Sequence, residues 1–305
     1  MQLLIQTALE LGLISALTVL ALFISYSMLN VCDLSTDGCF TYGACVGAVV
    51  AISGHPYLSI PAAMCAGALS GLVTSLLQTV FGINSLLSGI IVNTALYSIN
   101  IAVMGNSSLL NMNKTATVFT GLKEALASTP LKGYQTLIIA LIFVAAVILF
   151  ISLFFRTRIG LAIRATGDNI TMVRSSSINP TKTTIIALCI SGAITALSGC
   201  HLAQSQKSVN IDIGSGMVTI ALASLLIGRA FVGKGSIPKK AFGAVIGALI
   251  FRLVYMIALR FNMPAFMLKL VSAVIVILAI AGPYLKERYP LYKRKRMCGR
   301  GDGNA

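Results

Sequence analysis

The chain has 305 residues, of which 57% are apolar and only 10% are charged, and its mean hydropathy is +0.91. Soluble domains carry about 25% charged residues, so this composition excludes a soluble globular protein and indicates a membrane protein. At roughly 20 residues per transmembrane helix, the chain has room for about eight to ten spans and for no folded domain outside the membrane.

The net charge of +15 arises mostly from three clusters of Lys and Arg, at 156–182, 229–240 and 286–300. Each cluster lies in or beside a short polar stretch that borders an apolar run. Short basic loops are typical of the cytoplasmic side of a membrane protein, and anionic lipid is their ordinary partner. The charge therefore predicts orientation in a bilayer and argues against binding to nucleic acid.

The apolar runs predict an all-α polytopic helix bundle of about nine spans, within a range of eight to ten. Nine alternating spans place the N-terminus outside, the C-terminus in the cytoplasm and all three basic clusters inside. The second run is short, which is typical of a broken or re-entrant element as well as of a full crossing. The expected spans are 9–30, 38–54, 57–81, 84–105, 133–155, 183–204, 213–231, 241–260 and 264–284.

Two further segments complete the predicted organisation of one transmembrane domain, 1–285. The loop 106–132 is the longest outer connection, and VFTGLKEAL within it could form a short amphipathic helix on the membrane surface. The segment 286–305 reads as a basic cytoplasmic tail.

Glycines four residues apart recur in three of the expected spans. GACVGAVV at 43–50 resembles GAVIGALI at 243–250, and Gly67 and Gly71 repeat the spacing. Such pairs let two helices approach closely. They predict close helix packing, and the first two segments are also compatible with two pseudo-repeated halves, as in many transporters.

The fourth span places Asn93, Tyr97 and Asn100 on one helical face, at spacings of four and three residues. Amides are costly in lipid, so this face is expected to meet another helix or water. Two interpretations stay open: hydrogen bonding between helices, or the lining of a path for a solute.

The polar stretch from Gly160 to Pro180 lies within the loop 156–182, between two runs that could each span a bilayer. Gly160 is followed by residues able to form a short helix, and Asn179-Pro180 is expected to begin the next span. A short helix on the membrane surface could dock on another protein and pass its motion into the spans, although a solvated turn is the simpler interpretation.

The chain offers little for catalysis or for nucleotide binding. GRAFVGKGS at 228–236 has Gly235 where a phosphate-binding loop needs Ser or Thr for magnesium, and no strand precedes it. The seven cysteines form no CxxC pair, which excludes a zinc or disulfide framework of the usual kind. We therefore expect no enzyme activity and no cofactor in this chain.

Three segments, in this order, resemble the permease subunits of bacterial ABC importers of the branched-chain amino acid and ribose class. They are CDLSTDGCFTYGACVGAVVA at 32–51, IGLAIRATGDNITMVRSSSINPTKTTIIALCISGAITALSG at 159–199 and VTIALASLLIGRAFVGKGSIPKKAFGAVIGALI at 218–250. The fourth span and the outer loop depart from the sugar-type pattern. In these parts the chain is more similar to the subgroup linked to aromatic amino acid uptake.

The resemblance implies a function and a set of partners. It implies import of a small polar solute across the bacterial plasma membrane, with an amino acid favoured over a sugar or nucleoside. The partners would be a cytoplasmic ATP-binding subunit that carries ATP and Mg²⁺, an extracytoplasmic solute-binding protein and a second permease copy in a homodimer.

The resemblance also implies roles for individual residues. Asp33 and Ser35 would lie near a bend at the start of the second element. The coupling helix that docks on the ATPase would contain Arg164, Ala165, Thr166, Gly167, Asp168 and Asn169. A self-sufficient secondary carrier is the rival hypothesis, although no central carboxylate typical of ion coupling is evident in the sequence.

Overall fold

The computed structural model describes residues 2–113, 115–120, 134–233 and 235–260, with isolated positions between 270 and 277. Within these residues the chain is almost entirely helical, as the sequence predicts. The helices are α1 (Gln2–Leu22), α2 (Thr36–Ile52), α3 (Ser59–Thr79), α4 (Ser85–Val103), α6 (Gln135–Phe154), α7 (Arg158–Asp168), α8 (Ile170–Ser175), α9 (Pro180–Gln206), α10 (Met217–Val232) and α11 (Ile237–Arg260). A π-helix, η1 (Phe23–Met28), continues α1.

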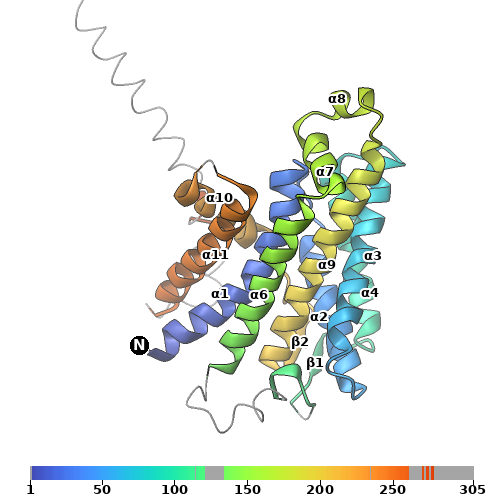
Figure 1. The fold of residues 1–305 in the computed structure, drawn as a ribbon. Coiled ribbons are helices and arrows are strands. Elements are labelled where there is room, and N and C mark those ends of the chain that lie inside the picture. The colour runs from blue at the N-terminus through green and yellow to red at the C-terminus, as the bar shows by residue number, and fades with distance from the viewer. Residues whose placement is uncertain are drawn as a thin grey trace, which may run out of the picture.

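Six of the described helical segments are long and apolar enough to cross a membrane. α2 and α10 are apolar but shorter, and each of the first eight expected spans coincides with a helix. The ninth, 264–284, and the tail 286–305 lie largely or wholly outside the described residues, so the number of nine spans and the orientation stay predictions. The structure is that of a multi-pass helix bundle (Figure 1).

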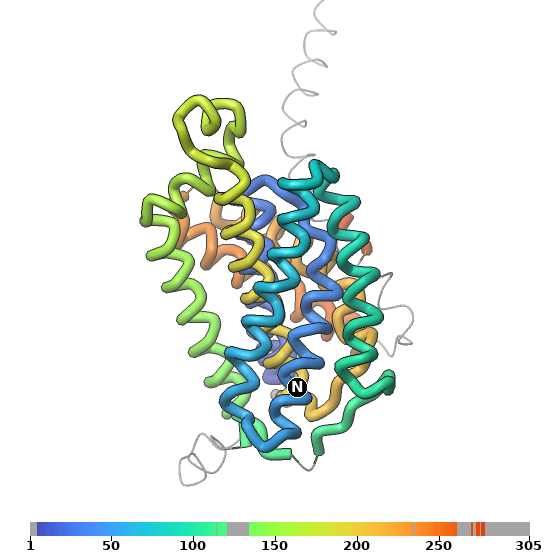
Figure 2. The backbone as a smooth tube through the Cα atoms, turned by 90° about the vertical axis from the view of Figure 1, so that its right-hand side faces the viewer, coloured from blue at the N-terminus to red at the C-terminus, as the bar shows by residue number. Residues whose placement is uncertain are grey.

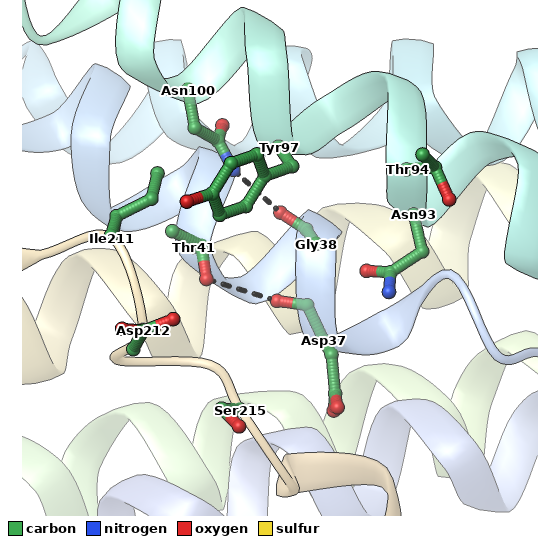
Figure 3. Close-up of a pocket in the computed structure, with 10 residues that line it drawn as sticks. All are labelled: Asp37, Gly38, Thr41, Asn93, Thr94, Tyr97, Asn100, Ile211, Asp212 and Ser215. Atoms are coloured by element: carbon green, nitrogen blue, oxygen red, sulfur yellow. Dashed lines mark hydrogen bonds between the residues drawn. The ribbon is translucent and has the colours of Figure 1, made fainter. Parts of the chain in front are cut away.

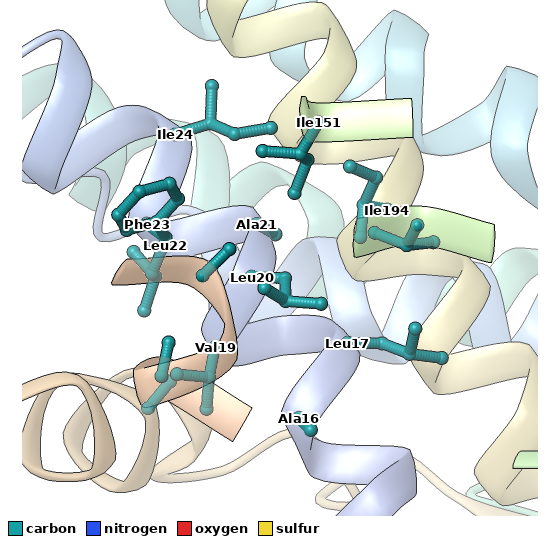
Figure 4. Close-up of a cluster of buried hydrophobic side chains, with 14 of the residues drawn as sticks. Ala16, Leu17, Val19, Leu20, Ala21, Leu22, Phe23, Ile24, Ile151 and Ile194 are labelled. Carbon is teal, nitrogen blue, oxygen red and sulfur yellow. The ribbon is translucent and has the colours of Figure 1, made fainter. Parts of the chain in front are cut away.

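The core of the bundle is built around α1 and α9. From Leu13 to Ile24, α1 and the start of η1 are buried on nearly every side (Figure 4). A helix that is apolar all round belongs in the interior of a large bundle. By contrast, α6 exposes large apolar side chains such as Leu149 and Phe150, as expected where a helix meets lipid rather than water.

The glycine pairs pack helices against each other, as predicted. A Cβ atom on Gly67 or Gly71 would collide with the backbone of α9, and one on Gly43 would collide with Ala196 of the same helix. Gly247 lies equally close to the backbone of α10. Close packing of small residues therefore accounts for the repeated spacing.

Two short strands join loops that are far apart in sequence. β1 (Leu109–Asn111) pairs antiparallel with β2 (Ser208–Asn210), with Leu110 opposite Val209. They lie at the opposite end of the bundle from α7 and α8 (Figures 1 and 2). This pairing was not predicted. The expected surface helix VFTGLKEAL is helical at 118–120, and the rest of it lies outside the described residues.

The chain changes direction between η1 and α2. The Leu29 amide donates to the Ile24 carbonyl in the π-helical pattern, and Asn30 follows with a φ of 59°. An irregular segment then leads back into the bundle, where α2 begins at Thr36. The second element is thus a helix of 17 residues preceded by an irregular segment.

Candidate functional site: a polar cavity between α2 and α4

A cavity of about 340 Å³ lies between α2, α4 and the segment that connects β2 to α10. Figure 3 shows the side chains that surround it, which come from three separate parts of the chain. The lining residues are Asp37, Gly38 and Thr41 of α2, Asn93, Thr94, Tyr97 and Asn100 of α4, and Ile211, Asp212 and Ser215 of the connecting segment. Most of these side chains are polar, although they lie among apolar helices.

The three residues predicted to share a face of α4 all line this cavity. Of the two interpretations of that face, hydrogen bonding between helices is present at Asn100, which bonds to α2. Its Nδ2 donates to the carbonyl of Gly38 at 3.4 Å, whereas its Oδ1 is buried without a hydrogen-bond partner in the described residues. Tyr97 is 51% exposed. The face therefore combines one contact between helices with a polar wall.

Asp37 is a residue of the cavity that sequence reasoning did not single out. Its carboxylate accepts from the amide of Gly216 at 2.9 Å and from the amide of Val218 at 2.8 Å. These amides belong to the first turn of α10, where unpaired N–H groups favour a negative charge. Asp37 thus joins the start of α2 to the start of α10.

The start of α2 lies level with the middle of α4. A Cβ atom on Gly38 would lie 2.6 Å from Oδ1 of Asn93, a residue near the centre of Ser85–Val103. The cavity therefore extends from the middle of the bundle toward the end with β1 and β2, where Ile211 and Asp212 follow β2 directly. A charged residue at such a depth is rare unless it is paired or functional.

The connecting segment packs against α2 through a glycine. A Cβ atom on Gly214 would collide with the carbonyl of Asp37 and the hydroxyl of Thr41. Gly216 has a φ of 83°, a conformation that favours glycine, and it precedes α10. These two glycines let the backbone of the segment form one wall of the cavity.

Asp33 and Ser35 lie in the irregular segment just before α2. Oδ1 of Asp33 accepts from the amide of Ser35 at 2.9 Å and from its hydroxyl at 2.6 Å. Thr74 of α3 donates to the hydroxyl of Ser35 at 3.2 Å. These bonds fix the irregular segment to α3, and neither residue lines the cavity.

The loop 156–182 forms two helices with an elbow between them. α7 ends at Asp168, and Asn169 caps α8, since its Oδ1 accepts from the amides of Thr171 and Met172. Asn179 caps α9 in the same way and Pro180 occupies its first turn, as the sequence predicts. The elbow stands at one end of the bundle (Figure 1).

The predicted coupling residues divide into two groups. Thr166 and Gly167 face the bundle: the hydroxyl of Thr166 lies 2.9 Å from that of Thr183 on α9, and Gly167 packs on the backbone of Met28 and Leu29. Ala165 is half-buried. The outward-facing residues, exposed to solvent or to a partner, are Arg164, Asp168 and Asn169.

The two hydrogen bonds that Asn169 accepts at the start of α8 predict how this residue stabilises the helix. Asn169→Ala should destabilise α8 by about 1 kcal/mol, because two amides lose their acceptor. Amide hydrogen exchange should then rise within Ile170–Ser175 and stay unchanged in α9. Asn169→Asp, which keeps the acceptor, is the matched control, and equal exchange in the two variants would contradict this role of the side chain.

Among the described residues, no group of three or more His, Cys, Asp and Glu side chains is placed to hold a metal ion. The six cysteines in this part of the chain are free thiols, three of them buried.

Comparison with known proteins agrees with this architecture. The protein family described as "branched-chain amino acid transport system / permease component" matches residues 4–280 of this chain. The tyrosine transport system permease protein of Clostridioides difficile is 31% identical over 88% of each chain, and the ribose import permease RbsC of Escherichia coli is 26% identical over 78% of this chain and 72% of RbsC. A chain of PsaBC from Streptococcus pneumoniae, solved in complex with Fab, has a TM-score of 0.53 at 17% identity and covers 94% of both chains, which shows a shared fold.

The match to the family description extends over nearly the whole chain, and the tyrosine permease exceeds 30% identity over most of both lengths. Members of this family are membrane-spanning transport subunits of ABC systems for amino acids and sugars, and they are not themselves catalytic. The chain belongs to the family of branched-chain amino acid transport system permease components.

Proposed function

We propose that this chain is the permease subunit of an ATP-driven importer that carries an aromatic amino acid into the cell across the plasma membrane. The observation that carries the proposal is the deep polar cavity between α2 and α4, in a protein of the ABC permease family. A solute crossing a bilayer needs polar groups at depth, and the hydroxyls, amides and carboxylates of this cavity supply them.

Packing connects the elbow between α7 and α8 to the cavity. Gly167 of α7 packs directly on the backbone at the end of η1. The chain continues from η1 through the irregular segment to Asp37, which holds the start of α10. A rigid displacement of α7 would therefore press on the segment that leads to the cavity wall.

The packing of α7 on η1 would allow a partner protein that moves α7 to move the cavity wall as well. We propose that Arg164, Asp168 and Asn169 contact a cytoplasmic ATPase, while Thr166 and Gly167 transmit the motion to α9 and η1. ATP and Mg²⁺ would reside on that ATPase. An extracytoplasmic binding protein would deliver the solute at the end with β1 and β2, and a second copy would complete a homodimer.

The preference for an aromatic amino acid rests on two supports. The relative from C. difficile is named for tyrosine transport and is more similar in sequence than the ribose permease. In addition, Tyr97 places an aromatic ring at the cavity, where it could stack on the ring of a solute.

The proposal predicts ATP-dependent uptake. The permease, co-expressed with its ATPase and binding protein and reconstituted in liposomes, should accumulate labelled tyrosine only when ATP is supplied to the ATPase side. An uncoupler should leave uptake unchanged while ATP is held constant. Uptake that an uncoupler abolishes at constant ATP would instead identify a secondary carrier.

The elbow should be required for assembly with the ATPase. Deleting 162–172 should abolish co-purification of the ATPase. Arg164→Glu, a charge reversal on one exposed side chain, should weaken it without removing a helix. Lys207→Glu, the same change in charge after α9 at the other end of the bundle, is the control. Normal assembly with both elbow variants would refute the docking role.

A further inference from the structure

A second polar pocket, of about 240 Å³, lies between the elbow and α10. It is lined by residues of η1, by Asn30, by Gly167 and Asp168 of α7, and by Arg229 of α10. It shares no lining residue with the cavity between α2 and α4. Two of its lining residues are charged, Asp168 and Arg229, and they have opposite signs and come from different helices.

Neither of these charges is paired within the described part of the chain. Both side chains are exposed, and no hydrogen bond or ion pair joins either of them to another described residue. Arg229 also borders a smaller pocket at the turn before α11, so Asp168 is the one acid among the described residues that line either pocket. On α7 itself, Arg164 stands one turn before Asp168 and is the alternative partner.

The position of Asp168 is unfavourable for α7. It is the last residue of Arg158–Asp168, where carbonyl groups without partners favour a positive charge and disfavour a carboxylate. Arg229 lies in the last turn of α10, where the same effect favours it. A cation that approached Asp168 would relieve the repulsion at the end of α7, and Arg229 is the cation that faces the same pocket.

α10 connects this pocket to the cavity. Its start is held by the carboxylate of Asp37, and Arg229 lies about 18 Å further along the helix. Gly228 and Gly247 bring the backbones of α10 and α11 into contact, since a Cβ atom on either would collide with the other helix. The two helices therefore form a stiff pair, and a displacement at Arg229 would reach the cavity wall.

We propose that Asp168 and Arg229 form an ion pair when this pocket narrows, an event that occurs in the permease alone and that movement of α7 by the ATPase makes more frequent. The inference rests on the proposed function and deepens it, because Arg229 becomes a positioning residue for transport. The elbow would then act on the cavity by two routes, through η1 to the start of α2 and through Arg229 to the start of α10.

Disulfide trapping in the permease alone tests whether the two positions meet. Asp168→Cys and Arg229→Cys are combined in the full chain in lipid nanodiscs. Four native thiols are first changed to Ser so that they cannot compete: Cys32, Cys65, Cys189 and Cys298. A disulfide needs Cα atoms within about 7 Å of each other, so it should form only when the pocket narrows.

The matched control for trapping pairs Arg229→Cys with Arg164→Cys, because Arg164 is exposed on the same helix as Asp168 but does not line the pocket. With copper phenanthroline as the oxidant, the disulfide between positions 168 and 229 should form at least about tenfold faster than the control disulfide. Equal rates, or no disulfide between positions 168 and 229, would overturn the proposal.

Exchange of the two charges tests the ion pair in transport. Asp168→Arg and Arg229→Asp should each lower ATP-dependent uptake about fivefold, the scale of one partly exposed ion pair. The double variant should return to within about twofold of wild type. An Asp168 that only contacted the ATPase would gain nothing from Arg229→Asp, so the absence of rescue would refute the ion pair.

The matched control for the exchange combines Asp168→Arg with Lys239→Asp. Lys239 is exposed in the first turn of α11 and lines neither pocket, so this variant has the same net charge as the exchanged one and should not recover. Equal recovery in the two double variants would show a response to net charge and would contradict a specific pair.

The two proposals fail in different ways. Wild-type uptake that does not depend on ATP would refute the proposed function, whereas disulfide trapping uses neither ATP nor an ATPase and would be unaffected. Conversely, ATP-dependent wild-type uptake without rescue in the exchanged variant would refute the ion pair alone.

Discussion

Gly192→Val should strongly destabilise the helix bundle. Gly192 of α9 packs on Gly67 and Gly71 of α3, and a Cβ atom there would collide with the carbonyl oxygen of Gly67 and lie 3.3 Å from the amide nitrogen of Gly71. Backbone atoms cannot rotate out of the way as a side chain can. Since α9 is the central helix, we expect a loss of about 3 kcal/mol or more from overpacking, seen as loss of the monodisperse peak in detergent and a lower apparent Tm.

The control for this prediction is the next residue along α9. Ala193 is half-buried and points about 100° away around the helix, and it is not among the nearest atoms that a Cβ on Gly67 or Gly71 would meet, so Ala193→Val adds apolar volume away from these glycines. It should keep the wild-type peak and Tm, and Gly192→Ala should fall between the two. A Gly192→Val protein as stable as wild type would show that α3 and α9 do not meet as closely as the structure has them.

Much of this fold could be predicted because lipid imposes simple rules. Long apolar runs must form helices, and Asn179-Pro180 is a strong start signal for α9. The spacing of Asn93, Tyr97 and Asn100 predicted that they share one helical face, and all three line the same cavity. These features are local, so the residues that determine each of them lie within a few turns of one another.

The features that were missed depend on contacts between distant segments. β1 and β2 pair over only three residues each and lie about a hundred residues apart, so neither has a periodicity to detect. The π-helix η1 has the same apolar composition as the helix it extends. Its presence depends on packing that no sequence window contains.

Asp37 was missed for a related reason. A hydropathy window places it just outside the second span, where a carboxylate needs no explanation. In the structure, the chain between η1 and α2 enters the bundle first, so that α2 begins level with the middle of α4 and Asp37 meets Gly216. The signal that could have found it was the shortness of the second run, since a helix too short to span must begin or end inside.

Asp37→Ala should abolish transport while leaving the bundle folded. The substitution removes the acceptor of the Gly216 and Val218 amides, and each unpaired amide would cost about 1–3 kcal/mol if water did not reach it. Because these groups border a cavity, water can replace much of the loss, so the expected damage is local. ATP-dependent uptake should fall at least about tenfold, as expected when about 1.4 kcal/mol or more of positioning is lost.

Hydrogen exchange separates this local effect from general unfolding. In Asp37→Ala, exchange should accelerate within 211–218, whereas α3 and the central part of α9 should keep wild-type protection. Thr41→Val is the matched control: it alters the same cavity and the same helix with a side chain of equal size, but Thr41 accepts no bond from the start of α10. If hydrogen exchange within 211–218 were the same in the two variants, the claim that Asp37 stabilises the start of α10 would be wrong. If exchange rose in Asp37→Ala and uptake did not fall, the cavity wall would not need to be fixed for transport.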